Sequence, residues 1–127
     1  MTAEQAYQLE SIYNSIKPNK IYIEKWKVQT TYDGRQGFGT LVLNVSGFSK
    51  LSIERIYKNS RISNIIDFGI YDPDLFPNNM IYGIKNTTDK QEFDITNYDN
   101  IMLYCYIDGN GTQGEYPDVQ ILGISVE

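Results

Sequence analysis

After Pro18 the chain is a series of short runs rich in β-branched and aromatic residues, each followed by a turn signal. Such residues favour strands, whereas the Gly, Pro, Asn and Asp pairs between the runs favour tight turns. Because no helical segment separates the runs, the strands are expected to pair antiparallel with one another. We predict a mainly β, jelly-roll-like sandwich domain over residues 19–127, with strands at 21–31, 39–46, 50–57, 64–71, 80–85, 91–96, 100–107 and 119–126.

Residues 2–17 have helical periodicity instead. Thr2 and Gln5 match a capping box, and Pro18 blocks continuation of the helix. A helix this short is marginal in water unless its apolar stripe is buried, either on the chain's own strands or against other copies of the helix. We predict that residues 1–18 form an oligomerisation or attachment helix, with a homotrimer as the expected assembly, through Ala6, Leu9, Ile12, Tyr13 and Ile16.

Two segments fifty positions apart resemble each other. Residues 43–57 align without gaps to residues 93–107, with Val45 matching Ile95 and Phe48 matching Tyr98. In each copy a strand ends, a short turn follows, and an aromatic residue precedes a new strand. We interpret the two segments as equivalent corners of a pseudo-symmetric sandwich, each plugged by its aromatic residue; chance similarity between two β corners is the alternative.

The second corner, Phe93-Asp94-Ile95-Thr96-Asn97-Tyr98, is followed by Ile101 and Leu103. This pattern resembles a recurring corner of jelly-roll carbohydrate-binding domains. A helix followed by a sandwich also resembles small virion proteins of tailed bacteriophages, such as fibre tips, baseplate receptor-binding proteins and capsid spikes. The resemblance implies a virion-surface protein that contacts other virion proteins through its helix and a host-cell glycan through its sandwich.

The composition excludes several chemistries. The chain has no His and one Cys, so it has no His-based nucleophile system, no His-ligated metal and no internal disulfide. Its net charge of −5 argues against nucleic-acid binding. The segment 108–119 begins like a calcium loop but lacks the required Gly and Glu. We therefore expect a non-enzymatic protein without metal or cofactor; a two-carboxylate glycan hydrolase remains the enzymatic alternative.

The polar, acidic start of the chain does not resemble a secretory signal, and its longest apolar run is too short to span a bilayer. We expect a protein that is not exported by a signal peptide and does not insert into membranes. Charge is uneven: residues 1–65 carry nine basic and five acidic side chains, and residues 66–127 carry two and eleven. Two solvated faces of unequal sign are the simpler explanation, and contact between the basic half of one subunit and the acidic half of the next is the alternative.

The strand at 100–107 is expected to have two apolar faces. Met102, Tyr104 and Tyr106 alternate with the inward residues, so a loop, the N-terminal helix, another subunit or a ligand must cover them.

The longest turn-rich segments, 72–79 and 108–118, are the candidate ligand loops, expected at the end of the sandwich away from the helix. Solvated connections are the competing interpretation. Their residues able to bind sugar hydroxyls or stack on a ring are Asp72, Asp74, Asn78, Asn79, Asp108, Asn110, Glu115 and Tyr116. A surface adhesion component is the leading function; a free-standing carbohydrate-binding module and a purely structural capsid-decoration or tail-assembly protein are the alternatives.

Overall fold

The computed structural model describes residues 20–111 and 116–127. Over these residues the protein is mainly β, as predicted from the sequence, with two four-stranded antiparallel sheets. Every predicted strand is present, and most bounds shift by only a few residues. The predicted helix with Ala6, Leu9, Ile12, Tyr13 and Ile16, and Glu115, lie outside the described residues. The strands are β1 (Ile21–Gln29), β2 (Gln36–Asn44), β3 (Lys50–Lys58), β4 (Ile62–Tyr71), β5 (Met80–Gly83), β6 (Gln91–Asp94), β7 (Asn100–Gly109) and β8 (Asp118–Val126).

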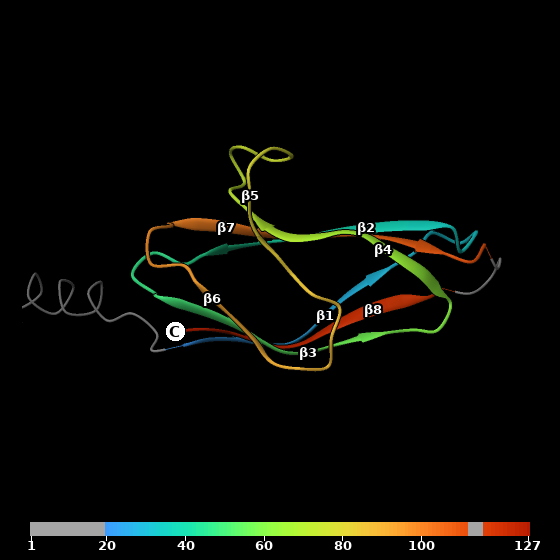
Figure 1. Cartoon of the computed structure of the whole chain (residues 1–127), viewed down its shortest axis with the longest axis horizontal. Helices are drawn as coiled ribbons and strands as arrows, with labels where there is room; N and C mark the ends of the chain where they lie inside the picture. Colours follow the sequence, from blue (N-terminus) through green and yellow to red (C-terminus); the bar gives the residue numbers. More distant parts are fainter. Residues whose placement is uncertain (1–19, 112–115) are drawn as a thin grey trace, which may run out of the picture.

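The two sheets lie face to face as a sandwich (Figure 1). Sheet A has the strand order β1-β8-β3-β6, and sheet B has the order β2-β7-β4-β5. The two orders correspond place by place. The strands at the same place in the two sheets, β1 and β2, β8 and β7, β3 and β4, and β6 and β5, are consecutive in the chain. Ile21 pairs with Val126, so the start of β1 and the end of β8 lie together at one end of the sandwich. A tight loop of residues 30–35, hereafter the β1–β2 hairpin, links β1 to β2 in the other sheet without pairing the two strands. It lies at the other end of the sandwich, with the end of β7 and the start of β8.

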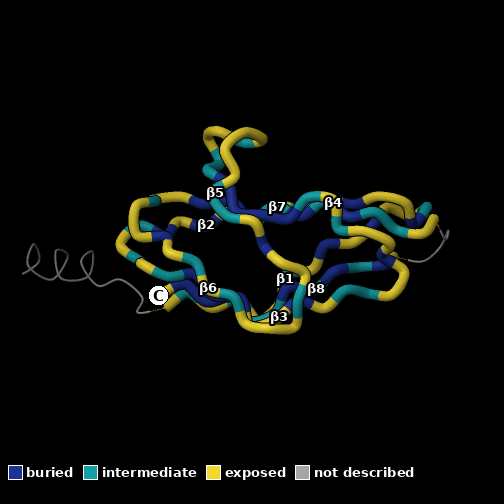
Figure 2. The backbone as a smooth tube through the Cα atoms, viewed as in Figure 1, coloured by how far each residue is buried: buried dark blue, intermediate teal, exposed yellow. Residues whose placement is uncertain are grey.

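The core fills the space between the sheets, and the buried parts of the chain follow the inner faces of the strands (Figure 2). On β7 the inward residues alternate strictly, as expected for a strand whose side chains point to opposite faces in turn. Burying such aliphatic side chains contributes about 1.5–3 kcal/mol each. The fully buried core residues on β7 and β8 are Ile101, Leu103, Cys105, Ile107, Val119, Ile121, Ile124 and Val126.

The two similar segments form equivalent corners, as their sequences predict. The Val45 amide donates to the Asp99 carbonyl at 2.7 Å, and the matching Ile95 amide donates to the Ser49 carbonyl at 2.9 Å. The two donors, Val45 and Ile95, are fifty positions apart in the chain, and so are the two acceptors, Ser49 and Asp99. The strand pairs beside the corners show the same offset of fifty positions. Asn44 pairs with Asn100, and the equivalent residues Asp94 and Lys50 pair with each other. The corners are therefore related by a local pseudo-two-fold axis.

The side chain that fills each corner differs from the predicted one. Val45 and Ile95 have no exposed surface, whereas Phe48 and Tyr98 are half-buried against the core. The aromatic residue follows a short turn, and its own amide donates a hydrogen bond to the carbonyl of the buried aliphatic residue. The distance is 3.0 Å from Phe48 to Val45 and 3.1 Å from Tyr98 to Ile95. This bond places the ring over the corner, and the aliphatic side chain inside it.

Sheet A contains a shared irregularity at its centre. Ile53 and Ile56 on β3 both face the core although they are three positions apart, and their partners Ile124 and Ile121 on β8 do the same. A regular strand would place inward residues two positions apart. Gly123 lies at this level with a φ of 66°, a left-handed conformation that glycine adopts without steric cost. The glycine thus allows Ile121 and Ile124, three positions apart on β8, to point into the same core.

Candidate functional site

The outer face of sheet B differs from the rest of the surface in its composition. Its four strands contain no Lys or Arg, whereas the strands of sheet A carry Lys25, Lys27, Lys50, Arg55 and Lys58. Sheet B exposes Phe38 (69%), Val42 (56%) and Ile66 (54%), and sheet A exposes Tyr22 and Tyr57 to a similar degree. The absence of basic residues beside these exposed apolar side chains makes the outer face of sheet B a candidate surface for a ligand or partner.

Two aromatic residues project from paired positions on this face. Phe38 on β2 and Tyr106 on β7 are register partners, and side chains at paired positions of neighbouring strands stand close together. The ring of Tyr106 is half-buried and that of Phe38 is not, so Phe38 offers the larger free ring surface. The pair forms an aromatic platform on the outer face of sheet B.

Part of the outer face of β7 is covered by the β4–β5 connection. Phe76 packs against Tyr104 with ring centroids 4.7 Å apart and against Tyr71 at 5.0 Å. Tyr71 also donates a hydrogen bond to the Asp67 carboxylate, at 2.8 and 2.9 Å from its two oxygens. Burial and the nearby carboxylate raise the pKa of Tyr71 to about 12. The loop alternative is therefore correct for Tyr104, Met102 is buried, and Tyr106 lies toward the groove described next.

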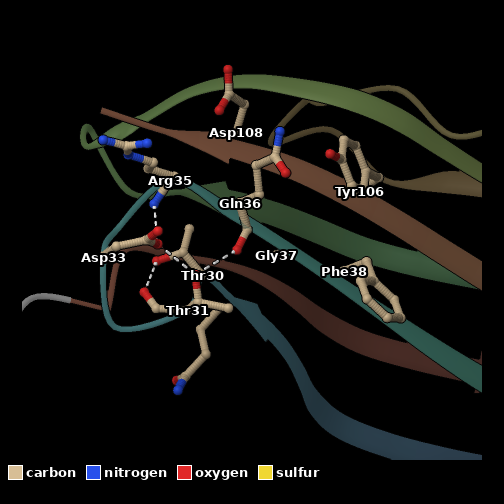
Figure 3. Close-up of a pocket in the computed structure, with 10 residues that line it drawn as sticks. Thr30, Thr31, Asp33, Arg35, Gln36, Gly37, Phe38, Tyr106 and Asp108 are labelled. Atoms are coloured by element: carbon tan, nitrogen blue, oxygen red, sulfur yellow. Dashed lines mark hydrogen bonds between the residues drawn. The ribbon is translucent and has the colours of Figure 1, made fainter. Parts of the chain in front are cut away.

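An open groove of about 730 Å³ runs from the platform to the β1–β2 hairpin. Figure 3 shows Phe38 and Tyr106 on neighbouring strands, with Gln36 and Asp108 projecting beside them. Carboxamide and carboxylate groups along one wall can donate to and accept from hydroxyl groups. The lining residues are Gln29, Thr30, Thr31, Asp33, Arg35, Gln36, Gly37, Phe38, Tyr106 and Asp108.

The Asp33 carboxylate accepts hydrogen bonds within the hairpin that borders the groove. Asp33 accepts a hydrogen bond from the Thr31 hydroxyl at 2.6 Å and another from the Arg35 amide at 3.1 Å (Figure 3). The Thr31 amide in turn donates to the Gln36 carbonyl at 3.0 Å. The hydrogen bond from Thr31, followed by that from Arg35, lowers the pKa of Asp33 because both stabilise its charged form. Asp33 therefore positions the hairpin, and Asp108 is the carboxylate left to face a ligand.

We expect Thr31→Val to raise the pKa of Asp33 toward its ordinary value, because the variant removes the first of these donors. A carboxylate whose pKa is lowered in the folded state stabilises that state above its unfolded pKa, and the contribution is lost as pH falls through the folded pKa. The variant should therefore lose less stability on acidification than the parent chain. NMR titration of the Asp33 carboxyl carbon measures the shift; an unchanged midpoint would contradict it.

Two exposed tyrosines lie beside the hairpin. Tyr32 in the hairpin and Tyr116 before β8 have ring centroids 6.0 Å apart, and both rings are about half exposed or more. The Thr30 amide donates to the Pro117 carbonyl at 3.1 Å, which fixes the chain after Tyr116 to the hairpin. The tip of the sandwich near the groove thus carries a second pair of rings.

The structure divides the predicted ligand residues between two places. Asp108 lines the groove, Asn110 precedes Gly111, whose amide donates to the Gly34 carbonyl in the hairpin, and Tyr116 lies against Tyr32. The loop at 72–79 instead projects from the face of sheet B, away from the hairpin (Figure 1). There Asp72 accepts a hydrogen bond from the Asp74 amide at 2.9 Å, and Asn79 has a φ of 58°. Asp72, Asp74, Asn78 and Asn79 thus form no common site with Asp108.

Gln29, Arg35, Gln36 and Phe38 were not among the residues predicted from the sequence. The alternation of Phe38, Thr40 and Val42 was the available signal, because it predicts that these residues share a face. The expected strand at 39–46 began just after Phe38 and so left its ring outside the strand.

The described residues offer little for metal binding or redox chemistry. The described residues contain no cluster of three or more Cys, Asp or Glu side chains placed to hold a metal ion. Cys105 is fully buried on β7, and burial raises the pKa of its thiol to about 12. Within the same described ranges, no helix is long and apolar enough to cross a membrane.

No protein-family model, curated protein sequence or solved structure matches this chain. The candidate site consequently rests on its geometry alone.

Proposed function

We propose that this protein is a non-enzymatic adhesion module that binds a hydroxyl-rich glycan in the groove between the β1–β2 hairpin and the aromatic platform. The observation that carries the proposal is the exposed ring of Phe38, held beside Tyr106 at the mouth of a groove lined by polar side chains. A large ring left open to water on a rigid strand is available for stacking.

The chemistry of the groove suits a neutral sugar better than a charged polymer. The C–H face of a sugar ring can stack on Phe38, while the carboxamides of Gln29 and Gln36 can bond adjacent hydroxyls. The Asp108 carboxylate disfavours a polyanion, and Arg35 is the single basic residue of the lining. The groove, at about 730 Å³, has room for one or two sugar rings.

We further propose that the sandwich is a jelly roll and that the protein belongs to the surface of a phage or phage-like particle. In support of the fold name, the strand orders 1-8-3-6 and 2-7-4-5 are those expected of two interlocked Greek keys. In support of a display role, the described chain enters and leaves the sandwich at the end opposite the groove. Attachment and self-association through residues 1–18, as a trimer, belong to the same proposal.

Replacing Phe38 by alanine is expected to weaken glycan binding by about 10–100-fold. Burying a phenylalanine side chain contributes roughly 1.5–3 kcal/mol, and each 1.4 kcal/mol corresponds to a factor of ten in affinity. A glycan array would identify a ligand for the parent chain, and titration calorimetry would compare the two proteins. Tyr57→Ala is the matched control, because Tyr57 is similarly exposed but lies on β3 of the other sheet.

Equal binding by the parent and Phe38→Ala would place the glycan site elsewhere. If the parent chain bound no glycan and no candidate host cell, the adhesion proposal would be wrong. A structural role in capsid decoration or tail assembly would then be favoured.

A further inference from the structure

The edge of sheet B formed by β2 is unprotected. Strand edges normally carry charged residues or are very short, because a free edge can pair with another chain. Of the four edge strands in the described part of the chain, β5 and β6 have four residues each, and β1 carries Lys25 and Lys27. β2 has nine residues, Gln36–Asn44, and contains no charged residue and no proline.

The free hydrogen-bonding groups of β2 can be identified from its pairing with β7. The Gly109 amide donates to the Arg35 carbonyl, and the Val45 amide donates to the Asp99 carbonyl. In an antiparallel pair such bonds recur at every second residue. The odd-numbered residues of β2 therefore bond to β7, while Phe38, Thr40 and Val42 direct their amides and carbonyls outward.

Nothing in the described chain pairs with this edge. β1 lies behind it in the other sheet, close enough that a Cβ on Gly39 would lie 2.9 Å from the Val28 Cγ2 atom. That contact is on the inner side of β2. On the outer side the even-numbered residues from Gln36 to Asn44 are all exposed.

We propose that two copies of the chain associate by antiparallel pairing of β2 with β2 about a two-fold axis at Thr40, which joins the two B sheets into one. An isologous contact requires a surface that is complementary to itself. With the axis at Thr40, Phe38 of each copy lies opposite Val42 of the other, and Gln36 lies opposite Asn44. This inference goes beyond the proposed glycan binding and does not depend on it.

The side-chain pairs in this register are those that stabilise antiparallel sheets. Aromatic residues opposite β-branched residues and Thr opposite Thr each contribute favourably across strands. Gln36 and Asn44 place a carboxamide pair at both ends of the contact, where side-chain hydrogen bonds replace water. The absence of charge on β2 removes the like-charge repulsion that a symmetric contact would otherwise create. These matches favour a second copy over an unrelated strand.

Disulfide trapping in the full-length chain tests the register. In the proposed dimer the two Thr40 residues are a hydrogen-bonded pair with Cα atoms about 5.5 Å apart, which is within the range that a disulfide spans. The two Val42 residues are displaced in opposite directions and lie roughly 13 Å apart. Under mild copper–phenanthroline oxidation, Thr40→Cys is expected to form a covalent dimer in high yield, and Val42→Cys only a trace.

The two variants control for each other, since both positions are exposed on one strand and the native Cys105 is fully buried. Association through residues 1–18 would not select position 40 over position 42. A mixture of Phe38→Cys and Val42→Cys should give a crosslinked heterodimer, although Val42→Cys alone does not. Equal trapping of Thr40→Cys and Val42→Cys, or trapping of neither, would overturn the proposal.

A second measurement does not rely on cysteine chemistry. Thr40→Pro removes an outward amide that β7 does not use, so the fold should tolerate it as edge strands tolerate proline. Light scattering should show that this variant has half the assembly mass of the parent, with circular dichroism checking its fold. An unchanged mass in a folded Thr40→Pro variant would contradict the edge pairing, whatever the outcome of the Phe38→Ala binding assay.

Discussion

An Ile95→Ala variant is expected to unfold with a free energy about 2–5 kcal/mol lower than that of the parent chain. The Ile95 side chain has no exposed surface and fills the corner between β6 and β7. Truncation removes buried methyl groups and leaves a cavity that the surrounding strands fill only in part. A loss of this size is a large fraction of the stability of a typical domain. Urea denaturation at constant m-value measures it.

The neighbouring aromatic residue provides the internal comparison. Tyr98 is half-buried over the same corner, so Tyr98→Ala should cost less than Ile95→Ala although it deletes a larger side chain. The equivalent corner should give the same order for Val45→Ala and Phe48→Ala after allowance for the smaller valine. A greater loss for Tyr98→Ala than for Ile95→Ala would show that the ring, and not the aliphatic residue, holds the corner.

Gly123→Ala should destabilise the fold by about 2–5 kcal/mol. The left-handed backbone conformation costs a non-glycine residue roughly 1–2 kcal/mol, and forcing an extra methyl group into a packed site adds about 1–3 kcal/mol. Both penalties apply here, since φ is 66° and the new Cβ would lie 2.6 Å from the Glu54 Cβ atom. Thermal unfolding followed by circular dichroism would record the loss.

Gly83 supplies a control on an edge strand. A Cβ at this position would have the Met80 Cε atom as its nearest neighbour at 3.7 Å, which is an ordinary van der Waals contact. Gly83→Ala should therefore change the unfolding temperature little. If Gly123→Ala were equally harmless, the face shift at the centre of sheet A would not require glycine.

The strands of this protein were predictable because their signals are local. β-branched and aromatic runs between turn residues located all eight, and the similarity between residues 43–57 and 93–107 predicted the paired corners. The start of β2 was predicted at residue 39, three residues late. In the structure Gly37 is needed because a Cβ there would collide with the Gln29 carbonyl oxygen. That close approach is a property of the packed sandwich and has no local signature.

The site was less predictable than the fold, because its residues come from strands that only the topology brings together. Asp108 was identified from its loop, but its neighbours Gln36 and Phe38 lie on a strand about seventy residues earlier. Pairing of β2 with β7 is what places them in one groove. Conversely, the segment 72–79 has the composition of a ligand loop, yet its Phe76 covers Tyr104. Composition alone does not distinguish a loop that packs on a sheet from one that faces a ligand.

The uneven placement of lysine has a practical consequence for handling the protein. Amine-reactive reagents can couple to β1, β3 and the segment 84–90, but they find no lysine on the strands of sheet B. Immobilisation on an amine-coupled sensor chip should therefore leave the β2–β7–β4 face directed toward the solution. Trypsin likewise has no cleavage site after Lys90, so the last three strands, β6, β7 and β8, should be released together as one long peptide, a convenient mass-spectrometric marker for crosslinks and ligand protection on β7.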